Sequence, residues 1–118
     1  MSLNRVIVMG LGKVGSLVAT LLHESHFKVT GVDAVKREGF PFATTVANLS
    51  DPASLRPLLA EADAVVSCLP FHLNLPLAKE AHAAGIHYFD LTEDVPTTNG
   101  IIELAKTSKG LMAPQCGL

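Results

Sequence analysis

Three glycines near the N-terminus are separated by one and then by two residues, in the order Gly10-Leu11-Gly12-Lys13-Val14-Gly15. They directly follow the apolar run Val6–Met9, and an amphipathic helical pattern follows them. In this context the first glycine allows a tight turn, the second lets backbone approach a pyrophosphate, and the third lets the helix pack on the strand. The helix N-terminus also favours negative charge. We therefore expect these six residues to bind a dinucleotide. The alternative is an ordinary glycine-rich turn.

Asp33 lies 18 residues beyond Gly15, at the end of a second apolar run. A carboxylate at this place accepts hydrogen bonds from the hydroxyl groups of an adenosine ribose. It also repels a 2′-phosphate, so Asp33 favours NAD over NADP. The adjacent Ala34 is also expected to contact the cofactor. An alternative interpretation of Asp33 is a loop residue that caps a turn. Lys36 and Arg37 could hold a 2′-phosphate, but we interpret both as solvated loop residues.

Two later positions complete the expected cofactor site. Asp51 precedes Pro52 at the start of a helix, where it either reaches the adenine or caps the helix. Leu69 and Pro70 follow the fourth apolar run and should line the nicotinamide end with backbone and apolar surface. His72, in the same loop, is interpreted as a surface histidine.

Catalytic residues cannot be assigned from this sequence. The carboxylates of Asp90, Glu93 and Asp94 are best explained by capping and solvation. The histidines show no metal-ligand spacing, so no metal site is expected. Cys68 and Cys116 are interpreted as two buried thiols in a reducing cytosol.

The elements that must position these residues alternate regularly between strands and helices. The expected strands are Val6–Met9, Lys28–Asp33, Ala43–Ala47, Ala64–Leu69, His87–Leu91 and one that begins at Leu111. The expected helices begin near Val14, Pro52, Leu73 and Thr98, and the last two end at Ala84 and Ser108. The first helix should face inward with five apolar residues, namely Val14, Leu17, Val18, Leu21 and Leu22. The last should do so with Ile101, Ile102, Leu104 and Ala105.

The apolar strands are continuous rather than alternating, which is typical of a parallel sheet covered on both faces. The sequence thus predicts the α/β class, a Rossmann-type doubly wound sheet of about six strands with helices on both faces. The 118 residues suffice for one domain, and a net charge of −2 argues against a nucleic-acid partner. No apolar run is long enough to cross a membrane, so a cytoplasmic protein is expected.

Three segments together indicate a family. They are the run from Val65 to Phe71 (Val-Val-Ser-Cys-Leu-Pro-Phe), the run from Ala81 to Thr92 (Ala-His-Ala-Ala-Gly-Ile-His-Tyr-Phe-Asp-Leu-Thr), and the run from Ala113 to Leu118 (Ala-Pro-Gln-Cys-Gly-Leu). With them the chain resembles the saccharopine dehydrogenase family, which includes lysine dehydrogenase-like enzymes. The resemblance extends from about Asn4 to Leu118.

This resemblance implies an enzyme in which residues 1–118 are the N-terminal NAD(P)-binding domain and an absent substrate domain follows. Such enzymes oxidise or form a C–N bond at an amino-acid carbon, with NAD or NADP as the hydride carrier. The cofactor positions carried over are Gly10, Gly12, Gly15, Asp33 and the Leu69-Pro70 loop, while Cys116 and Gly117 match the crossover into the second domain. We expect this fragment alone to be inactive, and the full-length enzyme to be a homo-oligomer.

A regulatory nucleotide-binding domain of potassium-channel type is the main alternative. Such domains share the glycine pattern and the acidic end of the second strand, but they bind ligand without turnover. The segment Gly85–Thr92 and the terminal Cys-Gly-Leu favour the dehydrogenase. A short-chain reductase or epimerase would need a Tyr-x-x-x-Lys pair, yet Tyr88 is followed at position 92 by threonine.

Overall fold

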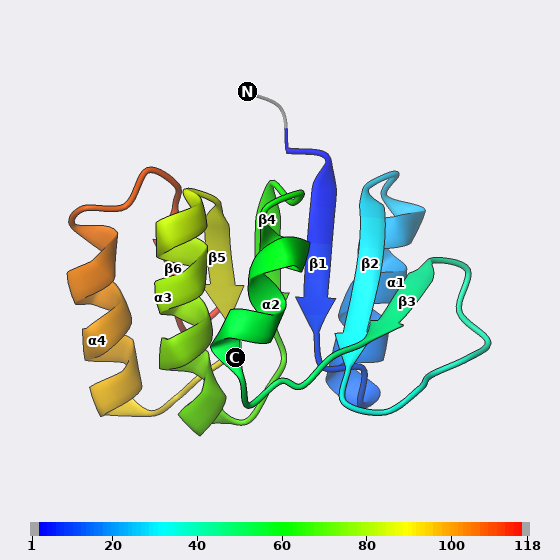
Figure 1. Cartoon of the computed structure of the whole chain (residues 1–118), viewed down its shortest axis with the longest axis horizontal. Coiled ribbons are helices and arrows are strands. Elements are labelled where there is room, and N and C mark those ends of the chain that lie inside the picture. The colour runs from blue at the N-terminus through cyan, green and yellow to red at the C-terminus, as the bar shows by residue number, and fades with distance from the viewer. Residues whose placement is uncertain (1–2, 117–118) are drawn as a thin grey trace.

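A computed structural model describes residues 3–116 of the chain. Its six strands form one sheet in which every neighbouring pair is parallel. The sheet order is β3-β2-β1-β4-β5-β6 (Figure 1). The strand bounds are β1 Arg5–Met9, β2 Lys28–Asp33, β3 Ala43–Val46, β4 Ala64–Ser67, β5 His87–Asp90 and β6 Met112–Ala113.

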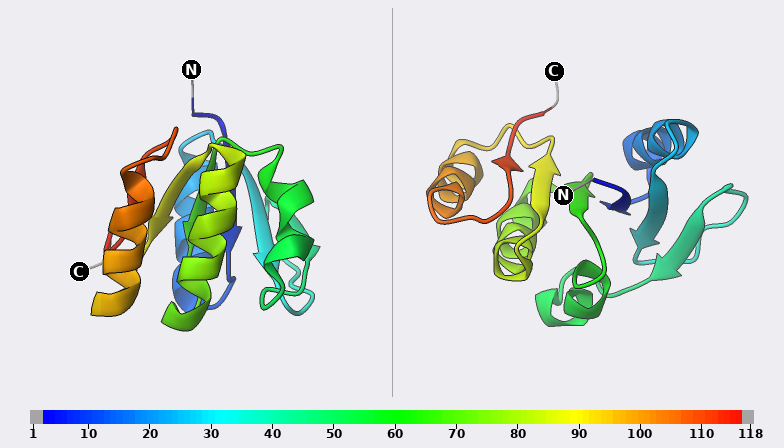
Figure 2. Two further views of the ribbon diagram at one scale, coloured as in Figure 1. Left: turned by 60° about the vertical axis from the view of Figure 1, so that its left-hand side comes forward. Right: turned by 90° about the horizontal axis from the view of Figure 1, so that it is seen from above.

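Helices cover both faces of this sheet, which confirms the doubly wound α/β prediction. Helices α2 (Pro52–Leu59), α3 (Asn74–Ala84) and α4 (Val95–Ala105) lie side by side on one face. Helix α1 (Lys13–Glu24) lies on the other, over β1 and β2 (Figure 2). A short 3-10 helix, η1 (Phe71–Leu73), leads from β4 into α3. Within residues 3–116, no helix is both long and apolar enough to cross a membrane.

The continuous apolar strands supply two cores, one on each face of the sheet. Met9, Val65 and Tyr88 belong to the core beneath α2, α3 and α4, and all three are fully buried. Val8 and Val29 belong to the smaller core beneath α1. Neighbouring residues of one strand, such as Val8 and Met9, therefore point to opposite faces of the sheet, as the pleat of a strand requires.

The inward face of α1 differs from the sequence prediction. Val14, Leu17 and Leu21 are each more than half exposed. The helix contacts the sheet through Gly15 and Ala19, which are buried and four residues apart. Small residues along this line allow a close approach, which turns the larger side chains away from the sheet. Val18 and Leu22 are the two expected inward residues that do pack on the core.

The start of α4 also differs from its prediction. The helix begins at Val95 rather than Thr98, and it ends at Ala105 rather than Ser108. Its start is fixed by Asp94, whose carboxylate accepts from the Thr97 N–H at 3.0 Å. On this helix Ile101 is buried, but Ile102 is 48% exposed and faces away from the core.

Candidate functional site

The carboxyl ends of all strands meet at one edge of the sheet, because the sheet is fully parallel. The strand order reverses between β1 and β4, and ligands of such sheets bind at that point. The glycine loop leaves β1 there, and the loop of Leu69 and Pro70 leaves β4. The two loops are in contact, since a Cβ added at Gly10 would lie 3.0 Å from the Cys68 carbonyl oxygen and 3.1 Å from Leu69 Cδ2.

The three glycines of the loop have different surroundings. Gly10 has a φ of +91°, a conformation that favours glycine, and its N–H donates to the Val32 carbonyl at 2.8 Å. A Cβ at Gly15 would lie 1.7 Å from the Gly10 carbonyl oxygen, so this position tolerates no side chain. A Cβ at Gly12 would meet nothing within 4 Å. The fold therefore requires glycine at position 10, for the turn, and at position 15, for the contact of α1. The space beside Gly12 is open.

The open space beside Gly12 lies at the N-terminus of α1. Gly12 is the N-cap residue, and no side chain caps the helix. The Ser16 N–H donates to the Gly12 carbonyl at 2.9 Å, while the Ser16 hydroxyl donates to the Leu11 carbonyl at 2.8 Å and steadies the loop. Lys13 and Val14, in the first turn, are exposed. Uncapped amides at a helix N-terminus, together with the helix dipole, favour an anionic group such as a phosphate.

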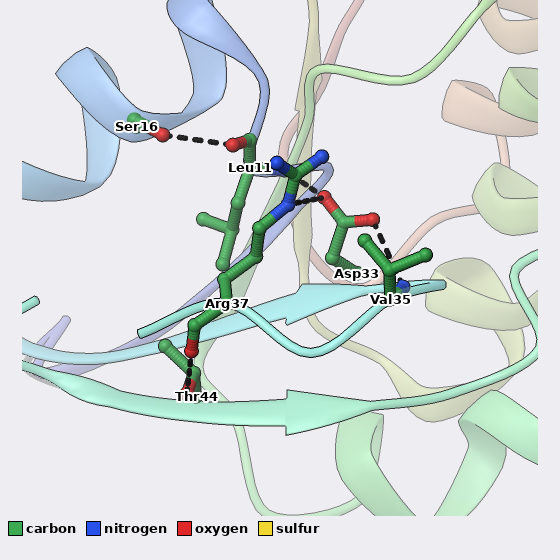
Figure 3. Close-up of polar contacts among 6 residues, drawn as sticks. All are labelled: Leu11, Ser16, Asp33, Val35, Arg37 and Thr44. Carbon is green, nitrogen blue, oxygen red and sulfur yellow. Dashed lines mark hydrogen bonds and ion pairs between the residues drawn. The ribbon is translucent and has the colours of Figure 1, made fainter. Parts of the chain in front are cut away.

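Asp33 joins the end of β2 to the glycine loop (Figure 3). Its Oδ2 accepts from the Leu11 N–H at 2.8 Å, and its Oδ1 accepts from the Val35 N–H at 3.3 Å. Burial raises the pKa of this carboxyl, but the N–H groups of Leu11, Val35 and Ala34, together with the charge of Arg37, lower the pKa by more. Asp33 is therefore ionised at neutral pH, with its carboxylate beside the loop.

Arg37 is exposed, as expected of a solvated loop residue, but it also pairs with Asp33. Its Nε is 3.4 Å from Asp33 Oδ2, and its carbonyl accepts from the Thr44 hydroxyl at 3.2 Å. The loop after β2 folds back along β3 and carries the guanidinium over the carboxylate (Figure 3). Lys36 does match the interpretation, because its ammonium pairs with Glu38 and both side chains are more than three-quarters exposed.

A hollow of about 230 Å³ lies beside this cluster. It is lined by Leu11, Val35, Lys36, Arg37, Thr44, Thr45 and Val46. Ala34 is exposed next to it. Asp51 is not among the lining residues, and its carboxylate accepts from the Ala53 N–H at 3.2 Å as the N-cap of α2.

A second hollow, of about 350 Å³, lies on the other side of the glycine loop. Its lining comes from α1, the end of β4 and the end of β5, namely Val14, Cys68, Leu69, Phe71, Leu91, Thr92 and Glu93. Pro70 is the N-cap residue of η1, and His72 is exposed. Burial raises the pKa of the Cys68 thiol to about 11, so Cys68 is neutral and is no activated nucleophile at pH 7.

A buried polar network around Asp90 lies at the carboxyl end of β5, and it was not predicted from the sequence. Asp90 is fully buried rather than solvated, and its carboxylate accepts from the Tyr88 hydroxyl at 2.6 Å. It also accepts from the N–H groups of Thr92 and Gln115, at 2.9 and 3.1 Å. Asp90 thereby fixes the loops after β5 and β6. A single tyrosine two residues before an aspartate on one strand was the available signal.

Cys68 follows β4 and Cys116 follows β6, at the same edge of the sheet. Cys68 and Cys116 are free, but Cys116 is exposed rather than buried as expected. Its N–H donates to the Asp90 carbonyl at 2.7 Å, so the buried network places it at the surface of this edge. Gly117, assigned by resemblance to the crossover, lies outside the described residues.

Residues 6–112 match the family described as the saccharopine dehydrogenase NADP-binding domain. No curated protein matches the chain. Among solved structures, apo saccharopine dehydrogenase (L-Glu forming) from Saccharomyces cerevisiae is similar, with a TM-score of 0.80 and 17% identity. The match covers 98% of this chain and 27% of the yeast chain.

Two NAD-bound structures share the fold. One is a short-chain dehydrogenase/reductase superfamily protein from Agrobacterium tumefaciens with bound NAD, with a TM-score of 0.62, 22% identity, and coverage of 74% of this chain and 32% of that one. The other is a uronate dehydrogenase mutant from the same organism complexed with NAD, with a TM-score of 0.59 and 16% identity. The match covers 77% of this chain and 41% of that one.

Proposed function

This chain belongs to the family of saccharopine dehydrogenase NADP-binding domains, and we propose that it is the cofactor domain of an oxidoreductase that acts on a C–N bond of an amino acid or a related imine. Its coarser assignment, an NAD(P)-binding domain of the oxidoreductase type, follows from the family. The potassium-channel-type alternative is not favoured by that match.

One observation carries the proposal for the site itself. The space beside Gly12 is open at an uncapped helix N-terminus, while its neighbours Gly10 and Gly15 are packed too tightly for any side chain. Such a cradle fits the pyrophosphate, which Gly12–Gly15 would hold through backbone amides, beside Leu11, whose own N–H is bound to Asp33. The adenosine ribose would then lie at Asp33 and Ala34, with Asp51 on the adenine side. The nicotinamide would lie toward Leu69 and Pro70, where it would supply the hydride acceptor or donor.

The charge of Asp33 makes NAD(H) the preferred cofactor in this proposal. A carboxylate accepts from two ribose hydroxyls but repels a 2′-phosphate, at a cost of about 1–3 kcal/mol near a protein surface. Calorimetric titration of the domain with NADH and NADPH tests this, and tighter binding of NADH is expected. Binding of neither cofactor would refute the proposed function, whereas tighter binding of NADPH would refute only the preference.

The substrate site belongs, in this proposal, to a further domain of the parent protein. The second hollow holds a neutral thiol, Cys68, and an exposed carboxylate, Glu93, but no polarised acid–base pair. Orientation of a substrate can supply about 7–11 kcal/mol of a barrier, and a proton-transfer group about 10²–10⁴ in rate. We therefore expect the purified 118-residue chain to show no turnover with NAD and a panel of amino acids that includes lysine and saccharopine. Turnover that disappears in His72→Ala would contradict this.

The cytoplasmic location and the homo-oligomeric state of the parent protein stay predictions. Two free cysteines are consistent with a reducing compartment.

A further inference from the structure

A chain of buried hydrogen bonds joins the carboxyl ends of β4 and β5 to the start of α3. Ser67 and Asp90, the last residues of the two strands, are partners in the sheet register, and both are fully buried. The Ser67 hydroxyl donates to Asn74 Oδ1 at 2.5 Å and accepts from the Leu69 N–H at 3.4 Å. One end of the network therefore lies directly beneath the loop of Leu69 and Pro70.

Tyr88 joins this end of the network to Asp90. Its hydroxyl lies 3.4 Å from the first carbonyl oxygen of α3 and donates to Asp90 Oδ2 at 2.6 Å. The other carboxylate oxygen, Oδ1, accepts from the N–H groups of Thr92 and Gln115 at 2.9 and 3.1 Å. The Asp90 carbonyl accepts from the Cys116 N–H at 2.7 Å. One buried residue thus binds both the segment after β5 and the segment after β6.

The segments that Asp90 holds lie on the side of the glycine loop where the nicotinamide is expected. Leu91, Thr92 and Glu93 line the second hollow, whereas Asp90 is not among its lining residues. Gln115 has a φ of +60°, a left-handed conformation that is uncommon for residues other than glycine. Such a conformation persists where surrounding contacts hold it, and the Gln115 N–H is one of the groups bound to Asp90.

We propose that Asp90 is a positioning residue for the nicotinamide half of the cofactor. From behind the second hollow it holds the segments Leu91–Glu93 and Gln115–Cys116 in the shape that receives the nicotinamide. The adenosine half does not depend on it, because β1 and β4 separate β5 from β2, which carries Asp33. The inference rests on the proposed function, since it concerns the other end of the same cofactor.

The contacts of Asp90 require a carboxylate. A carboxylate only accepts hydrogen bonds, and all three of its partners, the Tyr88 hydroxyl and the N–H groups of Thr92 and Gln115, are donors. An asparagine side chain fills the same volume, but its NH₂ group would face at least one of these donors. A buried donor without an acceptor is costly, so the two segments would shift to find other partners. Asp90→Asn should therefore change the wall of the second hollow and leave the glycine loop in place.

NADH and ADP-ribose distinguish the two halves of the cofactor, because ADP-ribose has the adenosine, the pyrophosphate and the second ribose but no nicotinamide. The test is a calorimetric titration of the wild-type chain, Asp90→Asn and Tyr88→Phe with both ligands. We expect Asp90→Asn to raise the Kd for NADH about tenfold, the range for lost hydrogen bonds to a charged group. The Kd for ADP-ribose should stay within about twofold of wild type. Tyr88→Phe removes one of the three bonds and should raise the Kd for NADH alone, by about threefold to fivefold.

Asp63 provides a matched control at the opposite edge of the sheet, where it directly precedes β4. Its Oδ2 accepts from the N–H groups of Asn4 and Arg5 at 2.9 and 2.8 Å. Asp63→Asn thus loses the same kind of hydrogen bond as Asp90→Asn. It should lower the stability of the chain but change neither Kd by more than about twofold.

The fluorescence of bound NADH gives a second measurement, one that a purely structural role of Asp90 would not change. Dihydronicotinamide emission shifts to shorter wavelength when the ring leaves water. At saturating NADH we expect this shift in the wild-type chain and in Asp63→Asn, and a smaller shift in Asp90→Asn.

Several results would overturn the inference. Equal rises of both Kd values in Asp90→Asn would show that Asp90 acts on the fold as a whole, and an unchanged Kd for NADH would show that it does not position the nicotinamide. A selective loss of NADH binding in Asp63→Asn would count equally against it. If Asp90→Asn does not fold, the same criteria apply to Tyr88→Phe. If the wild-type chain binds NADH and ADP-ribose equally well, the inference fails while the proposed function stands, and if it binds neither, both fail.

Discussion

Single residues at the carboxyl edge of the sheet divide into those that build the site and those that would contact a ligand. Gly10 and Gly15 are needed by the fold, because their neighbours leave no room for a side chain. Gly12 faces open space. The spacing predicted all three glycines, the turn role of Gly10 and the packing role of Gly15, but not the contact of the loop with Cys68 and Leu69, which are far away in the sequence. The pairing of Arg37 with Asp33 could not be predicted for a similar reason, since it depends on how the loop folds back along β3.

The glycines allow a direct separation of binding from folding. Gly12 has φ −71° and ψ −160°, an extended conformation open to any residue, so Gly12→Val should cost only about 1 kcal/mol of stability. It should nevertheless abolish NADH binding, because the side chain would occupy the pyrophosphate position. Gly15→Val should cost more than about 3 kcal/mol, because its Cβ would collide with the Gly10 carbonyl. Urea unfolding and NADH titration of both variants measure this, and retained binding in Gly12→Val would refute the assignment.

Asp33 should also give the stability of the chain a specific pH dependence. The pKa of Asp33 in the folded chain is lowered from the ordinary value of 3.8. Its contribution to the free energy of unfolding is therefore complete above pH 3.8 and is lost as the pH falls through the folded pKa. Wild type should therefore be more stable than Asp33→Asn at pH 7, and the gap should shrink below about pH 4. Urea unfolding of both proteins at pH 7 and pH 3 checks this. An equal difference in unfolding free energy at both pH values would show that the ionised form of Asp33 does not stabilise the folded chain.

At the scale of elements, the order and type of strands and helices followed from the apolar pattern, but the orientation of α1 did not. The pattern predicts one inward face on α1, but of its residues only Val18 and Leu22 pack on the core. The small residues Gly15 and Ala19 set this orientation, because they allow the helix to approach the sheet closely. A hydrophobic pattern does not identify small residues such as Gly15 and Ala19 as the contact face of a helix.

The orientation of α1 predicts opposite effects for two substitutions. Leu17→Lys should change the free energy of unfolding by no more than about 0.5 kcal/mol, because Leu17 is 59% exposed. Ala19→Leu should destabilise the chain by about 1–3 kcal/mol, because a fully buried alanine leaves no space for a larger side chain. Chemical denaturation of the two variants measures both values. If Leu17→Lys proved the more damaging, the helix would face the sheet with its other side.

For the molecule as a whole, the parallel sheet and its six strands could be predicted because short strand patterns, most of them apolar, alternate with helical patterns. The buried network around Asp90 could not, since Tyr88, Thr92 and Gln115 meet there only after β5 and β6 have paired. That network and the glycine loop converge on one edge, which is what gives the fold its site. On the face that α1 covers, no helix of residues 3–116 lies over β5 and β6 (Figure 2).

Binding of a nicotinamide dinucleotide at the Gly10 edge can be measured by an amide NMR titration of the isotope-labelled chain with NADH. The largest shifts should occur at Leu11–Gly15, at Ala34 and Val35, and at Leu69, with smaller changes elsewhere. Shifts confined to the opposite edge of the sheet, around the hollow lined by Arg5, Lys28 and Glu61, would contradict it. So would the absence of any shift in the glycine loop at saturating NADH.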